Sequence, residues 1–398
     1  MPETTDAPPA APLVPSRPER LATALRAATP ALLAYAAVRL LGLAILAAWA
    51  AVDGRNPLTL LNGRWDSVWY LRIAEHGYGF EAHLPDGGVH SDLAFFPLLP
   101  ALERGISEIS PLTPAGAGLL VGWLASLVAA WGIYAVGSRL YGHRTGLVLA
   151  VLWGVCPTAF VQSMAYTETL FTALAAWALY AVLTRRRLWA SALAVLAGLT
   201  RPSAAAVVAA IIIPAAVTLI QDYRAGARLR ALVREHGRMI TAACLAPLGW
   251  LAYVLYVAVR NGGLFAYFEV QGAWGNGIDG GVALAGFVWE QLTGPVFLGG
   301  IGIIAALALL GWLCALCVRQ RQPLPLLVYA GVVVFTSLVS AGYFGSRPRL
   351  MMPAFPLLLP IAVALARLRP ARTALALGAL ALASGAYGAF TLLGSGPP

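Results

Sequence analysis

The chain has 398 residues, of which 60% are hydrophobic and 11% are charged, whereas soluble domains carry about 25% charged residues. Its mean hydropathy is +0.76. This composition excludes an ordinary soluble protein, and no block as long as a soluble domain interrupts the apolar runs. All 27 basic residues are arginine and the formal net charge is +10.

Residues 1–30 are rich in proline and alanine, which predicts a disordered cytoplasmic N-terminus. The first apolar run, 31–52, is too long for a signal-peptide core and predicts an uncleaved anchor. Runs of about 20 apolar residues then recur, so we predict an all-α polytopic membrane protein with about eleven transmembrane helices. Residues 31–393 are interpreted as one transmembrane domain and 394–398 as a short tail. The predicted spans are 31–52, 115–138, 145–163, 167–184, 188–200, 203–221, 240–259, 296–318, 324–342, 350–366 and 373–393.

The arginines predict the orientation. With the N-terminus in the cytoplasm, most of them fall in inner segments, as the positive-inside rule requires. Most acids fall in outer segments. The basic inner face would meet the anionic lipid leaflet, so we expect the bilayer and no nucleic acid as a partner.

Two predicted outer loops are long, at 53–114 and 260–295. Loops longer than about 15 residues are usually functional or disordered. The first is rich in Trp, Tyr, Phe and Ile, which predicts an ordered loop with interfacial helices.

An amphipathic helix is predicted within 53–114 because Trp65, Val68, Trp69 and Arg72 recur at helical spacing. Asp66 begins this helix. It is either an N-cap or a general base facing a cavity at membrane level. The two interpretations conflict, because a helix N-terminus weakens a carboxylate as a base.

Further along this loop, His83, Asp86, His90 and Asp92 sit among Gly and Pro. Metal ligation is one interpretation. We favour the interpretation that these residues belong to a solvated loop, or that His90 and Asp92 contact sugar hydroxyls. We predict no metal site.

Other candidates lie at predicted span ends. Glu168 begins a span and is either a cap or a site residue. Arg201, Arg347 and Arg349 lie outside, against the positive-inside trend, and either bind phosphate or pair with outer acids. Arg39 lies within a span, where we expect a buried polar contact.

Five stretches in this order, "RWDSVWYLRIAEHGY", "AFFPLLP", "AYTETLFTALAAWALY", "GLTRPS" and "SRPRLMMPAFPLL", carry a resemblance. The chain resembles a bacterial, actinobacterial-type member of the PIG-V family, the GPI mannosyltransferase 2 group, from about residue 30 to 366. The resemblance implies a GT-C fold and a polyprenyl-phosphate mannose donor, used without a cofactor on the non-cytoplasmic face of the plasma membrane. It places the catalytic acid at Asp66 and maps Glu168 and Arg201 onto family positions.

The chemistry expected from these residues is a single inverting displacement. Asp66 would act as base, Glu168 as a supporting acid, and Arg201, Arg347 and Arg349 as contacts of the donor phosphate. Trp65, Trp69 and Tyr70 would wall the donor entry. The acceptor is a glycan, a glycolipid or a protein. The alternatives are a secondary transporter and a non-catalytic scaffold of the cell envelope.

Overall fold

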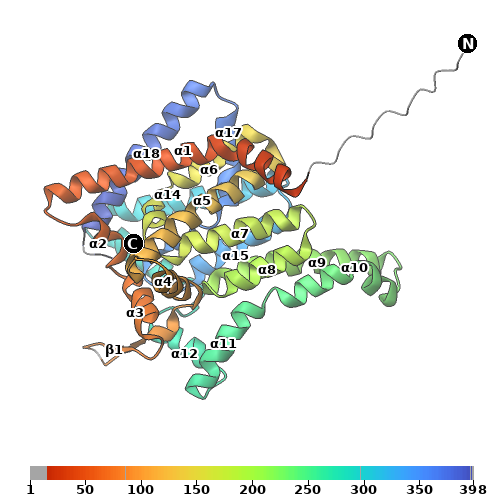
Figure 1. Ribbon diagram of the computed structural model, residues 1–398, viewed down its shortest axis with the longest axis horizontal. Helices are drawn as coiled ribbons and strands as arrows, with labels where there is room; N and C mark the ends of the chain where they lie inside the picture. Colours follow the sequence, from red (N-terminus) through yellow and green to blue (C-terminus); the bar gives the residue numbers. More distant parts are fainter. Residues whose placement is uncertain (1–15, 86, 296, 395, 397–398) are drawn as a thin grey trace, which may run out of the picture.

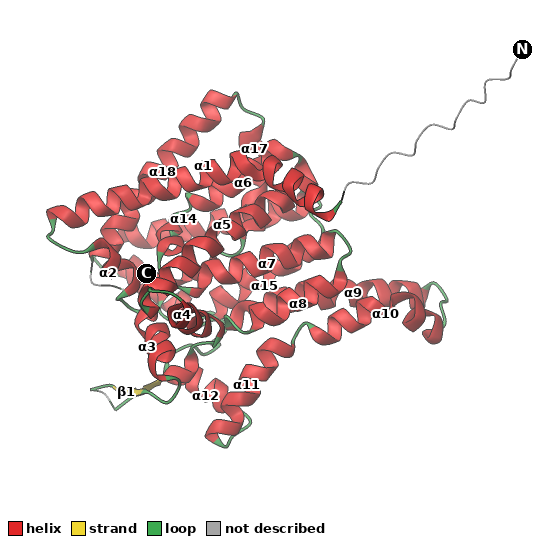
Figure 2. Ribbon diagram, in the orientation of Figure 1, coloured by secondary structure: helices red, strands yellow, loops and turns green. Residues whose placement is uncertain are grey.

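The computed structural model describes residues 16–85, 87–295, 297–394 and 396. Over these residues the chain is a bundle of helices with one two-stranded hairpin (Figures 1 and 2). The bundle consists of α1 (Arg17–Val52), α5 (Pro114–Tyr141), α6 (His143–Gly154), α7 (Thr167–Leu183), α8 (Arg187–Gly198), α9 (Ala205–Arg224), α10 (Leu229–Leu245), α11 (Leu248–Asn261), α14 (Phe297–Arg319), α15 (Leu324–Val339), α17 (Leu359–Ala366) and α18 (Pro370–Leu393). The all-α prediction is confirmed.

Six of the described helices are long and apolar enough to cross a membrane. A seventh span results if Phe344–Met351 and Phe355–Ala366, bent by 76°, are counted as one. The predicted count of eleven is therefore not confirmed, because several predicted spans form shorter apolar helices such as α7, α8 and α15. The chain is a multi-pass membrane protein.

The first helix begins earlier than expected. Residues 17–30 were predicted to be disordered, but α1 begins at Arg17. The reason is a capping box: the Ser16 side chain accepts the N–H of Glu19, and the Glu19 carboxylate accepts the N–H of Ser16. The predicted disorder of residues 1–15 concerns a part of the chain outside the described residues.

Small residues let the central helices approach closely. A Cβ added at Gly137 of α5 would lie 2.9 Å from the Cα of Gly146 in α6. A Cβ added at Gly132 would lie 2.9 Å from the Cβ of Ala176 in α7. Such contacts are typical of helix packing in membranes, where dispersion replaces the hydrophobic effect.

The described residues of the segment 53–114 are ordered, as predicted. It contains α2 (Pro57–Asn62), α3 (Asp66–His76), α4 (Leu98–Ile109), the antiparallel strands β1 (Glu81–His83) and β2 (Val89–Ser91), and the 3-10 turn η1 (Asp92–Ala94). The segment 260–295 contains α12 (Ala266–Ala273) and α13 (Val282–Thr293). Figure 1 shows α2, α3, α4, β1 and α12 at one end of the bundle, and the start of α1 and the α9–α10 connection at the other.

Short irregular elements interrupt the bundle and carry several polar residues. They are η2 (Ala159–Ser163), η3 (Pro202–Ala204), η4 (Phe344–Ser346), α16 (Arg347–Met351) and η5 (Phe355–Leu358). In membrane proteins, non-helical backbone is tolerated where protein or a cavity surrounds it. These breaks are therefore the natural places for a functional site.

Candidate active site

The start of α3 has an unusual backbone. Trp65 occupies the N-cap position with φ +53° and ψ −127°, and its side chain makes no capping bond. A bulky residue at positive φ is strained, and such strain clusters at functional sites. Arg64 stabilises the turn, because its guanidinium lies 4.0 Å from the centre of the Trp65 ring. Asp66 is the first helical residue, so the N-cap interpretation of Asp66 is not what the structure shows.

Four charged side chains from separate segments meet beside this turn. The Asp66 Oδ2 lies 2.7 Å from the Arg349 Nη1. The Arg349 Nε lies 3.4 Å from the Glu168 Oε1, which also pairs with the Arg201 Nη1. Asp66 begins α3, Glu168 lies in the first turn of α7, Arg201 precedes η3 and Arg349 lies in α16. The structure thus brings together four residues that the sequence singled out.

Hydroxyl groups complete this cluster. The backbone N–H of Asp66 donates to the Tyr166 hydroxyl at 3.2 Å. Thr167 Oγ1 accepts from Arg201 Nη1 at 3.3 Å and shares a hydrogen bond with the Tyr70 hydroxyl at 3.1 Å. Burial raises the pKa of Tyr70, so its phenol stays neutral. Tyr166 and Thr167 were missed as site residues, although they directly precede Glu168 in the sequence.

Exposure separates the two acids. The Glu168 side chain is 1% exposed and the Asp66 side chain 30%. Arg201 and Arg349 are 12% and 10% exposed. Glu168 therefore forms ion pairs with Arg201 and Arg349 from the buried side of the cluster. Asp66 is the acid that a ligand can reach. With two acids and two arginines, the cluster is formally neutral.

Arg347 points elsewhere. It donates to the carbonyls of Leu338 and Ser340 at 2.9 Å and 2.6 Å, at the C-terminal end of α15. Its charge therefore offsets the negative end of that helix dipole. Among the described residues, Asp66 and Glu168 form ion pairs with Arg201 and Arg349 and none with Arg347, which stands apart from the four-residue cluster.

The predicted loop residues have different environments. Trp69 stacks on Phe95 at 5.5 Å between ring centres, and His90 stacks on Trp274 at 4.1 Å. Asp92 is fully buried, and its carboxylate accepts the backbone N–H groups of Gly79 and Phe80. Its oxygens are thus engaged within the loop.

The described residues do not support the interpretation that this loop binds a metal. No group of three or more His, Cys, Asp or Glu side chains that could hold a metal occurs among the residues the structure describes. Asp86 lies outside the described residues, and Asp92 is engaged with backbone N–H groups. We build no metal into the site.

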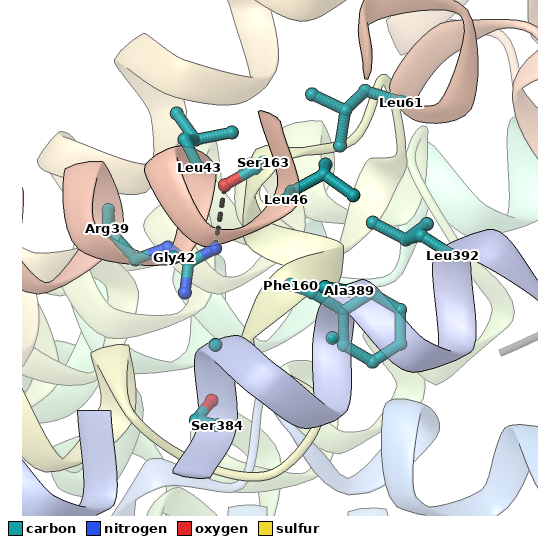
Figure 3. Close-up of a pocket in the computed structure, with 12 residues that line it drawn as sticks. Arg39, Gly42, Leu43, Leu46, Leu61, Phe160, Ser163, Ser384, Ala389 and Leu392 are labelled. Carbon is teal, nitrogen blue, oxygen red and sulfur yellow. Dashed lines mark hydrogen bonds between the residues drawn. The ribbon is translucent and has the colours of Figure 1, made fainter. Parts of the chain in front are cut away.

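Arg39 has the buried polar contact expected of it. In Figure 3 its guanidinium reaches from α1 towards Ser163, and it donates to Ser163 Oγ at 2.7 Å and to the Gly154 carbonyl at 3.2 Å. The adjoining pocket has a volume of about 10 Å³, room for about one water. Because Ser163 shortly precedes Glu168, Arg39 ties α1 to the segment that carries the site.

Known proteins share this arrangement of helices. A family model described as dolichyl-phosphate-mannose-protein mannosyltransferase matches residues 97–250, which include Glu168 and Arg201. ArnT from Cupriavidus metallidurans bound to undecaprenyl phosphate superposes with a TM-score of 0.52 at 15% identity, over 87% of this chain and 62% of ArnT. The chain has the GT-C fold.

Two curated proteins are similar to this chain in sequence. GPI alpha-1,6-mannosyltransferase 2 of Mus musculus is 34% identical over 150 residues, and that of Cricetulus griseus is 33% identical. These relatives confirm the resemblance to the GPI mannosyltransferase 2 group. Each alignment covers 34% of this chain and 28% of the relative, so the chain matches less than a third of their length. Their activity enters below as a proposal.

Proposed function

We propose that the chain is an inverting membrane glycosyltransferase that moves mannose from polyprenyl-phosphate mannose to an acceptor on the non-cytoplasmic face. The observation that carries the proposal is the convergence of Asp66, Glu168, Arg201 and Arg349 at one end of the bundle. A reachable carboxylate beside two nearly buried arginines suits an acceptor hydroxyl and a phosphate leaving group.

The reaction balances with these groups alone. An acceptor oxygen forms a bond to the anomeric carbon of the sugar while Asp66 takes the hydroxyl proton. The bond between the anomeric carbon and the phosphate oxygen breaks, and its electron pair leaves with polyprenyl phosphate. Arg201 and Arg349 stabilise the charge that grows on that phosphate.

Arg349 links donor binding to the base. In the structure it pairs with Asp66 at 2.7 Å and approaches Glu168 at 3.4 Å. The cluster is formally neutral, so a phosphodiester brings the first uncompensated charge and competes with Asp66 for Arg349. Transfer of Arg349 to the phosphate frees the Asp66 carboxylate to accept a proton. Glu168, which stays buried, keeps both arginines in position.

The choice of donor and sugar is supported by similarity to known proteins, and the remaining residue roles are supported by position in the structure. ArnT was crystallised with undecaprenyl phosphate, and the curated relatives are named as mannosyltransferases. Trp65, which is half-buried and directly precedes Asp66, is a candidate wall of the donor entry, and His90 is a candidate contact for hydroxyls. Asp92 and Trp69 are packed within the loop and act by shaping it.

The test uses membranes that contain wild type, Asp66→Asn or Glu75→Gln, supplied with polyprenyl-phosphate mannose labelled in the sugar and native extract as acceptor. Glu75 is a matched control, since it lies on the same helix and its side chain is 43% exposed. We expect label in a new product with wild type and Glu75→Gln, and a loss of about 10²–10⁴ with Asp66→Asn.

Other results would redirect the assignment. Equal transfer by Asp66→Asn and wild type would exclude Asp66 as the base. No transfer by wild type, together with uptake of unaltered substrate into vesicles, would favour a transporter. A chain that supports envelope assembly with both Asp66 and Glu168 neutralised would be a scaffold.

A further inference from the structure

A second site candidate lies on the far side of α16. A cavity of about 350 Å³ separates α13 from the segment that follows α15. Its lining includes Phe287, Glu290, Tyr343, Phe344 and Arg347. Pockets that hold small molecules have volumes of about 300–1,000 Å³. The cavity is therefore large enough for a sugar ring and differs from the four-residue cluster in every lining residue named.

Arg347 gives the cavity a fixed polar wall. The residue is 4% exposed and donates to backbone carbonyls of residues 338 and 340. Its Nε is buried and has no hydrogen-bond partner among the residues that the structure describes. Because this atom is closed to solvent, Arg347 contributes a positioned positive charge to the wall and not a free N–H donor.

Aromatic rings form the apolar part of the cavity lining. Phe287 and Phe344 stack at 4.1 Å with an interplanar angle of 20°. Tyr343 is 61% exposed and its ring folds over Gly345, where an added Cβ would clash with that ring. The glycine therefore sets the orientation of an exposed aromatic face.

The wall formed by α13 is held in place. Asp279 accepts the N–H groups of Gly281 and Ala283 at 2.8 Å and 2.6 Å, at the start of α13. These hydrogen bonds lower the pKa of Asp279. The N–H of Asp279 donates to the Val339 carbonyl at 3.0 Å. The two walls are thus joined by backbone hydrogen bonds, and Glu290 extends from a positioned helix.

The cavity and the candidate active site share α16. Arg347 lines the cavity, and Arg349 pairs with Asp66 and Glu168. Two residues along a helix are about 200° apart around its axis and about 3 Å along it. The two arginines therefore face opposite sides of one short helix, so that α16 lies between the cavity and the four-residue cluster.

We propose that this cavity binds a hexose of the acceptor, so that the acceptor is a glycan or glycolipid. Aromatic faces and the carboxylate of Glu290 match the flat faces and hydroxyl edges of a neutral sugar. A phosphate is disfavoured because Glu290 would repel it. The inference deepens the proposed function and rests on it for the role of the sugar as acceptor.

The experiment measures binding without turnover. Purified chain in lipid nanodiscs is titrated with methyl α-mannoside, methyl α-glucoside and the corresponding disaccharides, followed by saturation-transfer NMR. The variants are Tyr343→Ala and Glu290→Gln, with Tyr343→Phe to retain the ring. Trp289→Ala is the matched control, since Trp289 is 68% exposed on α13 and does not line the cavity.

We expect wild type, Asp66→Asn, Tyr343→Phe and Trp289→Ala to bind at least one saccharide alike. Tyr343→Ala and Glu290→Gln should bind it about tenfold more weakly. The inference is overturned if the wild-type protein binds none of the saccharides. It is also overturned if Tyr343→Ala and Glu290→Gln both bind with the affinity of the wild-type protein.

The two proposals fail separately. Cavity-dependent sugar binding without any transfer from labelled donor would remove the acceptor role and the proposed function, and leave a sugar-binding site. In a second outcome, Asp66→Asn abolishes transfer while Tyr343→Ala leaves the KM for the acceptor unchanged. That result would uphold the proposed function and exclude the cavity from acceptor binding.

Discussion

Replacing Glu168 with glutamine tests the electrostatic logic of the cluster. Glu168 is the partner shared by Arg201 and Arg349, and its side chain is 1% exposed. Glutamine keeps the size and removes the charge. The change leaves Arg201 without an acid, while Arg349 keeps its contact with Asp66 at 2.7 Å.

The expected cost follows from burial. Removing one partner of a buried ion pair typically costs about 3–5 kcal/mol, because the other charge is left uncompensated. Arg201 and Arg349 retain 12% and 10% exposure, and one ion pair remains. We therefore expect the lower end, a loss of about 3 kcal/mol in the free energy of unfolding.

The assay is unfolding of purified protein in mixed micelles with rising SDS content, followed by near-ultraviolet circular dichroism. Glu75→Gln is the control and should stay within about 0.5 kcal/mol of wild type. A double variant, Glu168→Gln with Arg201→Gln, should lose less than the sum of the single variants, by about 0.5–3 kcal/mol. A Glu168→Gln variant as stable as Glu75→Gln, or additive losses in the double variant, would refute the cluster as an interdependent unit.

Three further changes probe the surroundings. Burial, and to a smaller extent the charge of Glu75, raise the pKa of Glu103 on α4 from 4.5 to about 9, so its carboxyl is protonated when folded and ionised when unfolded between these values. The free energy of unfolding should therefore fall as pH rises through that window, and Glu103→Gln should flatten this slope in titrations at several pH values. Gly118→Ala would push a methyl group against the Glu103 carboxyl group and should lower the unfolding free energy by about 1–3 kcal/mol in the same assay. Arg39→Lys cannot reach both of its acceptors and should cost about 1–3 kcal/mol, whereas unchanged stability would show that Arg39 holds nothing in place.

Much of the fold was accessible from apolar periodicity and its interruptions. The predicted run 167–184 matches α7 (Thr167–Leu183), and 324–342 matches α15 (Leu324–Val339). In both cases a Pro or a polar residue bounds the run. The count of spans was less accessible, because hydropathy does not distinguish a full crossing from a shorter buried helix. The start of α1 was missed because a capping box at Ser16 outweighed the Pro-rich composition.

The site was accessible as a set of residues but not as a set of contacts. The family resemblance indicated Asp66, the position of an acid at a span end indicated Glu168, and the positive-inside trend singled out Arg201 and Arg349. The structure brings all four together. Nothing in the sequence separates Arg349 from Arg347, which are two positions apart. Their separation needs α16, whose helical turn sends one guanidinium to the acids and the other to carbonyls of residues 338 and 340.

The conflict between capping and catalysis at Asp66 has a structural resolution. An acid at the N-cap would spend its oxygens on the helix N–H groups and lose basicity. Here Trp65 takes the N-cap position at positive φ, and the Asp66 N–H goes to the Tyr166 hydroxyl. The Asp66 carboxylate is thereby left to Arg349, a partner that an anionic donor can draw away. In the proposed reaction, the strain at Trp65 is thus the local cost of keeping Asp66 available as the base.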